Sequence, residues 1–189
     1  MNVEHYIPAD IGFVVAGANV QRIMNSVFTP CTDLFHAFVI YEYLPDEDDY
    51  VIIESRAGFG FRITRLSKYD QYMMFRISDP EIASHGYEAV RLVTQIGESR
   101  YDLPLVFSIL RQVLSITIGG LFHGRWPHKI NAKELKYTPD DRYICTETAS
   151  ETWKTVNYYI VPKGTIPLPS AYQEVINNGK LLELERELV

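Results

Sequence analysis

Three residues of this chain, Cys145, His36 and Glu54, could together carry out thiol chemistry. Such chemistry needs a thiolate, a base that takes the thiol proton and a group that orients the base. The acidic residues Asp140 and Asp141 precede Cys145, and the residues after it have helical spacing, so we predict that a helix begins near it. The N-terminus of a helix has unpaired N–H groups and a partial positive charge, which favour a thiolate and can stabilise an oxyanion.

His36 and Glu54 are predicted to lie on the two strands of one hairpin. Each is nine residues from Pro45, so a turn centred there would place them directly opposite one another on the same face. Cβ atoms in such pairs are about 4.5–5.5 Å apart, which allows an imidazole–carboxylate hydrogen bond. Glu54 would then fix the imidazole tautomer, and protonated His36 would stabilise the Cys145 thiolate. This pairing depends on the register of the hairpin.

Each of these residues also has an ordinary structural explanation. An isolated cysteine in an apolar context is more often a core residue than a nucleophile. His36 could be a hydrogen-bonded core histidine, and Glu54 could form a salt bridge with Arg56 or Arg62 without any catalytic part. The combination of the three residue types favours catalysis. Cys31 has no such partners in the sequence and is expected to be inert.

Three further residues are candidates for contacts with the substrate or the oxyanion. Tyr143 comes two residues before Cys145 and could line a cleft, donate to an oxyanion or simply pack. Thr146 directly follows Cys145 and is a candidate for the same roles. Asp10 could border the site or merely end a strand, and the structural role is favoured.

The composition excludes several classes of function. The chain has 189 residues, 47% of them hydrophobic, and a net charge of −6 with no dense basic cluster, so nucleic acid is not an expected partner. Two cysteines do not make a disulfide framework. His123 and His128 flank Pro127, which disfavours a helical metal pair, so we predict neither a metal nor a cofactor.

Because no signal peptide or transmembrane segment is recognised in the sequence, we predict a cytoplasmic protein. The first ten residues lack the basic-then-apolar order of a signal peptide. The longest apolar region, 103–114, is interrupted by polar residues and falls short of the roughly 18 residues that span a bilayer, so no transmembrane segment is predicted. Delivery by a particle or a lysis event stays open, and no oligomeric state is predicted.

The spacing of apolar residues predicts an α+β fold. Strands are predicted over 10–16, 35–43, 50–55, 59–66, 72–77 and 158–161, and helices over 19–28, 80–96, 102–116, 143–156 and 173–178, with a loop over 119–137. Asp102 can cap the third of these helices, and Gly97 suits the end of the second. We found no internal repeat or linker, and we therefore expect one domain over 1–189 with an antiparallel sheet packed against helices.

Four segments resemble, in their order, motifs of the circularly permuted NlpC-like hydrolases of papain fold, and in particular the YiiX-like group. They are Asp-Ile-Gly-Phe at 10–13, Phe-His-Ala-Phe-Val-Ile-Tyr at 35–41, Val-Ile-Ile-Glu-Ser at 51–55 and Tyr-Ile-Cys-Thr-Glu at 143–147. In the permuted branch the histidine strand precedes the cysteine. Ser-Arg-Tyr-Asp at 99–102 and Ile-Pro-Leu-Pro-Ser at 166–170 extend the resemblance over nearly the whole chain.

The resemblance implies a papain-like fold and a Cys–His–Glu triad at Cys145, His36 and Glu54. It also implies a cysteine hydrolase (peptidase or amidase) or acyltransferase that works through an acyl-enzyme on peptides, cell-wall peptides or lipids. This chain departs from the family pattern: Phe35 and Thr146 stand where the family often has Ser, and the hairpin loop is longer. Two other functions stay open, namely a non-catalytic structural or binding protein with a retained hydrolase fold, such as a phage-particle component, and a lipid acyltransferase resembling lecithin:retinol acyltransferase.

Overall fold

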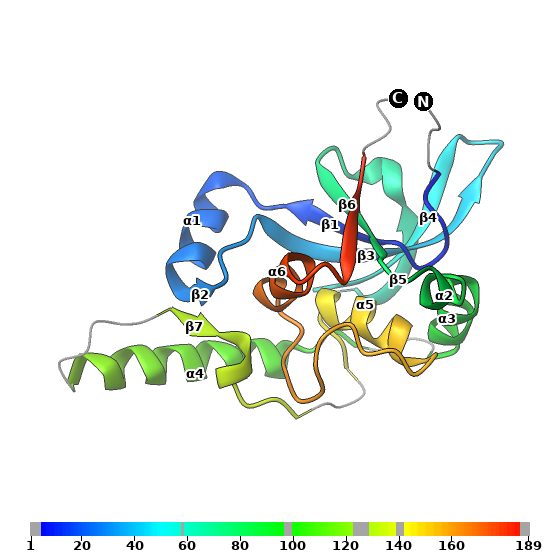
Figure 1. Ribbon diagram of the computed structural model, residues 1–189. Helices are drawn as coiled ribbons and strands as arrows, with labels where there is room; N and C mark the ends of the chain where they lie inside the picture. The colour runs from blue at the N-terminus through cyan, green and yellow to red at the C-terminus, as the bar shows by residue number, and fades with distance from the viewer. Residues whose placement is uncertain (1–4, 58, 97–99, 123–128, 139–141, 186–189) are drawn as a thin grey trace.

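The structure, a computed structural model, describes residues 5–57, 59–96, 100–122, 129–138 and 142–185 (Figure 1). Its strands are β1 (Ile11–Val15), β2 (Phe28–Thr29), β3 (Leu34–Leu44), β4 (Asp49–Arg56), β5 (Gly60–Arg65), β6 (Tyr72–Ile77), β7 (Ile130–Asn131) and β8 (Leu181–Leu184). Its α-helices are α1 (Ala18–Val27), α2 (Pro80–Ala83), α3 (Gly86–Val93), α4 (Leu103–Phe122), α5 (Cys145–Lys154) and α6 (Pro169–Asn177). Short 3-10 helices are η1 (Leu66–Lys68), η2 (Thr94–Ile96) and η3 (Ala132–Glu134).

A six-stranded antiparallel sheet organises the fold, with strand order β5-β4-β3-β1-β6-β8. Its central strands are buried on both faces, because successive side chains alternate between two apolar clusters. Val39 and Ile53 belong to the main core, whereas Phe38, Ile40 and Ile52 belong to a smaller cluster. The chain is therefore an α+β protein, as its sequence predicts.

Helices α3, α5 and α6 pack against β3 and close the main core. Trp153 of α5 is buried, and its Nε1 donates to the carbonyl of Ala9 at 3.1 Å, which fixes α5 to the chain just before β1. A Cβ on Gly86 would lie 2.2 Å from the carbonyl oxygen of Pro8, so the start of α3 approaches this segment more closely than any other residue type allows. Both contacts hold helices against the entry to the sheet.

The register of the β3–β4 hairpin differs from the predicted one. Glu54 lies opposite Phe38, not opposite His36, so the predicted direct pairing is wrong. The ladder closes at Leu44 and Asp49, later than a turn centred on Pro45 requires, and it shifts by one residue at Tyr41. Because His36 and Phe38 are two residues apart on one strand, His36 and Glu54 still share a face as diagonal neighbours.

Most predicted elements are confirmed, and the differences have local causes. The predicted strand over 158–161 is wrong, because Ile160 and Val161 are buried by apolar contact without joining a ladder. The last strand is instead β8, which pairs with β6. The predicted helix over 80–96 is interrupted between α2 and α3, and this turns the side chain of Tyr87 outward, where 71% of it is exposed.

Helix α4 is longer than predicted and takes up the beginning of the predicted loop over 119–137. Asp102 Oδ1 accepts from the backbone N of Leu105 at 2.8 Å, as expected of a cap. The 18-residue window Leu103–Gly120 of α4 has a mean hydropathy of 1.5. By length and composition alone, this helix is long and apolar enough to cross a membrane. The absence of a transmembrane segment stays a prediction. Gly97, His123, Pro127, His128, Asp140 and Asp141 lie outside the described residues.

Candidate active site

Cys145 is the first residue of α5, as the sequence predicts, and it is partly exposed. Backbone N–H groups in the first turn of a helix have no acceptor within the helix, so they can face an anion. The segment before the helix is held in place from two sides. Ser55 Oγ of β4 donates to the carbonyl of Tyr143 at 2.7 Å, and the backbone N of Ile144 donates to Glu147 Oε2 at 2.7 Å.

His36 joins the thiol to the carboxylate. Its Nε2 is hydrogen-bonded to Glu54 Oε2, and its ring lines the same cleft as the side chain of Cys145. Burial by itself would lower the pKa of His36, but the interactions of the ring with the side chains of Cys145 and Glu54 raise this pKa to about 9. The ring is therefore an imidazolium at neutral pH.

Glu54 is fully buried, and four side chains satisfy its two oxygens. His36 and the hydroxyl of Tyr69 bind Oε2. Arg62 Nε and Lys68 Nζ donate to Oε1 at 2.8 and 2.9 Å. Burial alone would raise the pKa of Glu54, but these hydrogen bonds hold it well below its usual range. Glu54 thus forms the salt bridge with Arg62 that the sequence left as an alternative, and it binds His36 as well.

Tyr69 is a site residue that the sequence did not indicate. Its ring stacks on Phe38, with centroids 5.5 Å apart and planes 7° from parallel. Phe38 in turn occupies the space above Gly12 on β1, where a Cβ would lie 2.0 Å from the ring. Burial and the charge of Glu54 raise the pKa of Tyr69, so its hydroxyl stays a donor to the carboxylate. Gly12, within the first of the four motifs, therefore supports the site indirectly.

Cys145 and His36 line one cleft with a volume of about 360 Å³. It lies where β1 and β4 end and β3 begins, and its walls are Val14, Phe35, His36, Arg56, Ala57, Tyr69, Tyr101 and Cys145. The exposed Phe35 and the half-buried Tyr101 give the cleft aromatic walls, and Arg56 gives it a positive charge. Burial and the nearby negative charge of Cys145 raise the pKa of Tyr101 to about 12.

The other three candidates do not line this cleft. Asp10 is buried and forms an ion pair with Arg76, with Oδ2 2.7 Å from Nη2. Tyr143 contributes a backbone carbonyl to Ser55. Thr146, the second residue of α5, is buried, and its carbonyl accepts from the hydroxyl of Tyr172 at 2.9 Å. These contacts support structural roles for the three residues.

Cys31 lies away from the cleft but has a charged neighbour. It is exposed, and Lys129 Nζ lies 3.0 Å from its Sγ. The sequence predicts an inert Cys31 because nothing in it places Lys129 there. Because Cys31 is exposed and Cys145 is partly exposed, any measurement of thiol reactivity must separate the two cysteines.

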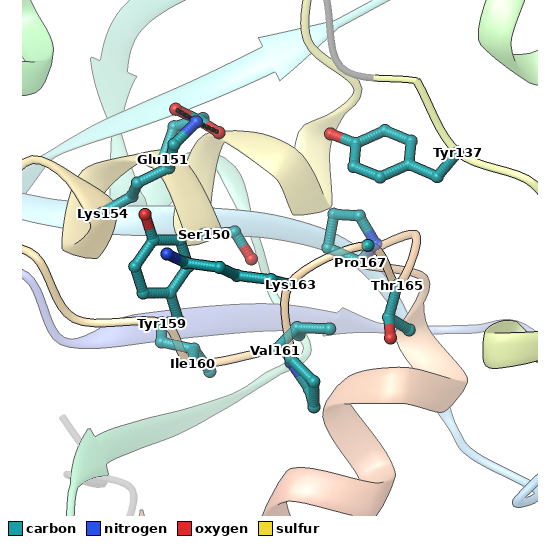
Figure 2. Close-up of a pocket in the computed structure, with 12 residues that line it drawn as sticks. Tyr137, Ser150, Glu151, Lys154, Tyr159, Ile160, Val161, Lys163, Thr165 and Pro167 are labelled. Carbon is teal, nitrogen blue, oxygen red and sulfur yellow. Dashed lines mark hydrogen bonds and ion pairs between the residues drawn. The ribbon is translucent and has the colours of Figure 1, made fainter.

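A second cavity, of about 320 Å³, lies beside α5 (Figure 2). It contains neither Cys145 nor His36. The charged side chains within it already have partners: Lys154 pairs with Glu151 at 2.8 Å, and Lys163 lies 4.3 Å from the centre of the Tyr159 ring. In the described part of the chain, no group of three His, Cys, Asp or Glu side chains could hold a metal ion.

The site therefore has a thiol, an imidazolium and a buried carboxylate in series beside an open cleft, an arrangement that can perform nucleophilic acyl transfer. A scan against protein-family models gave no match to this chain, and a comparison with curated proteins found no similar sequence.

Proposed function

We propose that this protein is a thiol hydrolase or acyltransferase that acts on an amide or ester bond through Cys145, His36 and Glu54. One observation carries the proposal: Cys145 and His36 line the same cleft, and His36 is hydrogen-bonded to the buried carboxylate of Glu54. A buried carboxylate that orients an imidazole, which in turn pairs with a nucleophile, is the arrangement that activated nucleophiles require.

The reaction follows from these positions. The Cys145 thiolate attacks the carbonyl carbon of the substrate, and a C–S bond forms while the carbonyl oxygen takes the negative charge. The N–H groups at the start of α5 stabilise this oxyanion. The tetrahedral intermediate collapses, the bond to the leaving group breaks, and the His36 imidazolium donates its proton to the leaving amine or alcohol. Water or another acceptor then attacks the thioester carbonyl and His36 takes the proton of this acceptor. The C–S bond breaks and releases Cys145 as the thiolate, which restores the thiolate–imidazolium pair.

Glu54 is a positioning residue in this scheme. It holds His36 in one orientation and stabilises the imidazolium, and Arg62, Lys68 and Tyr69 hold Glu54. The order of the elements supports a permuted papain-like fold as the finer description, because the histidine strand β3 precedes the cysteine helix α5 and packs against it. Phe35 stands where the family often has Ser, so this wall of the cleft is apolar rather than polar.

Acylation by an activated ester tests the proposal without knowledge of the substrate. The Cys31→Ser protein, which retains Cys145, is mixed with p-nitrophenyl acetate at neutral pH. We expect a burst of nitrophenol equal to the amount of protein and an acetyl group on Cys145, located by peptide mass spectrometry. His36→Ala should slow this acylation at least about 100-fold, because Cys145 loses the imidazolium that stabilises its thiolate, and a positioned acid–base group typically contributes that factor.

The matched control is the Cys145→Ser protein, which retains Cys31 beside Lys129. Acetylation of Cys31 in that protein should not depend on His36. If Cys145 is acylated no faster in the folded Cys31→Ser protein than in the same protein in denaturant, the chain is a binding or structural protein and the proposal fails. Hydrolysis and acyl transfer are separated by product analysis with added amine and alcohol acceptors.

A further inference from the structure

Helix α4 is apolar on two opposite sides, and the described part of the chain covers only one of them. Leu105, Ile109, Val113 and Ile116 recur every three or four residues and pack against the main core. On the other side lies the α4 apolar face, defined as Leu103, Phe107, Leu110, Leu114, Ile118 and Phe122, all of which are exposed. A helix that is apolar all round is normally buried in a protein core or a membrane. Only 6% of the Leu103–Gly120 window is buried.

The position of α4 makes the uncovered side accessible over its whole length. The helix runs along one edge of the molecule and extends beyond β7, away from the large sheet (Figure 1). Twenty residues correspond to about 30 Å of helix. Phe122, at the far end, is 84% exposed, and Leu103, at the near end, is two residues from Tyr101 in the wall of the cleft. Continuous apolar faces of this length mark sites of docking.

The charges around α4 indicate what covers this face. Segment 100–137 has six Lys or Arg residues and two Asp or Glu residues, whereas the whole chain has a net charge of −6. Three charged side chains of this segment have partners within the fold, since Asp102 caps α4, Glu134 accepts from the backbone N of Asn131, and Lys133 pairs with Glu174. Exposed basic residues, among them Arg111, Lys129 and Lys136, thus accompany an apolar face. A second copy of this segment would bring like charges together, while an anionic lipid surface would attract them.

Helix α4 is also anchored to the domain at its middle. Gln112 Oε1 accepts from the backbone N of Lys136 at 2.7 Å, and its Nε2 donates to the carbonyl of the same residue at 3.2 Å. Crossing a bilayer would break these bonds and expose the side packed on the core. A helix that keeps one side on the protein and offers the other to lipid lies in the plane of the membrane surface.

We propose that the α4 apolar face docks the protein on a bilayer with anionic headgroups, with the helix axis parallel to the membrane plane. Docking would place the membrane beside the Tyr101 end of the cleft. This inference goes beyond the proposed function, because it requires no thiol chemistry. A Cys145→Ser protein should therefore dock as well as the unchanged protein, and failure of either idea leaves the other standing.

Vesicle flotation tests the docking. The full chain is mixed with vesicles of equal parts phosphatidylcholine and phosphatidylserine, or with phosphatidylcholine alone. We expect binding to the anionic vesicles, at least about tenfold weaker binding to the neutral ones, and a similar loss in high salt. The double variant Leu110→Asp with Leu114→Asp should reduce binding at least about tenfold, since it places two charges in the apolar face.

The matched control is Leu182→Asp on β8, because Leu182 and Leu110 are both 53% exposed. It should bind as the unchanged protein does. Arg111→Glu provides a second test that leaves the apolar side chains in place, and it should weaken binding to anionic vesicles alone. The proposal is overturned if the protein binds neither the anionic nor the neutral vesicles. The proposal is also overturned if light scattering shows that the unchanged protein is a dimer, and the double substitution abolishes this dimer without changing vesicle binding.

Discussion

The link between Cys145 and His36 can be measured directly as the pKa of the histidine. Raising a histidine pKa from 6.5 to about 9 corresponds to about 3 kcal/mol in favour of the imidazolium. Burial acts against this change, so the partners Cys145 and Glu54 together supply more than that amount. The effects of Cys145 on this pKa are larger than the corresponding effects of Glu54, so Cys145 supplies at least half of the total, about 1.5 kcal/mol or just over one pKa unit.

We therefore predict that Cys145→Ala lowers the pKa of His36 by at least about one unit. The assay is an NMR titration of the imidazole nitrogens in the labelled protein with and without the substitution. The resonances of His85, which lies on the surface near α3, serve as an internal control and should be the same in both proteins. Since the folded pKa is raised, the stability that protonated His36 contributes is fully present below about pH 6.5 and is lost as the pH rises through about 9.

Two results would refute this reasoning. The first is a His36 that titrates near pH 6.5 in the unchanged protein, which would mean that the two partners do no more than offset the effect of burial. The second is a high pKa that Cys145→Ala leaves unchanged. In that case Glu54 alone stabilises the imidazolium, and Cys145 does not contribute to the raised pKa.

Two further predictions concern buried carboxylates. Glu54→Gln removes the charge that faces Arg62, Lys68 and His36, and we expect it to lower the free energy of urea unfolding at neutral pH by about 3 kcal/mol. The control Glu47→Gln breaks an exposed pair with Arg65 and should cost less than about 1 kcal/mol; equal losses would mean that burial of Glu54 is unimportant. Burial raises the pKa of Glu147 from 4.5 to about 7, so its contribution to stability is fully present below about pH 4.5 and is lost as the pH rises through about 7. The unfolding free energy of the unchanged protein, relative to Glu147→Gln, should thus fall by roughly 3 kcal/mol from acidic to mildly alkaline pH, and a constant difference would contradict the raised pKa.

The sequence by itself determined the elements whose pattern is local. Alternating and helical spacing of apolar residues predicts the α+β class, β1, the strands from β3 to β6, and the start of α5 at Cys145. Side chains of a strand alternate between the two faces of the sheet. Any hairpin register that differs from the predicted one by an even number of residues therefore keeps His36 and Glu54 on one face. These properties depend on residues near one another in the chain, so a single sequence is enough to infer them.

Only the tertiary structure decided the features that depend on distant residues. The shift at Tyr41 and the later turn set Glu54 opposite Phe38, and no local pattern specifies either. The carboxylate then meets Lys68 and Tyr69 because η1 and the residue after it follow β5 back to the site, and it meets Arg62 through the β4–β5 ladder. Likewise, the apolar pattern of α4 resembles that of a core helix, and the side left uncovered follows from where the rest of the chain packs. Burial is a property of the assembled fold, since it is set by contacts between segments that the sequence separates.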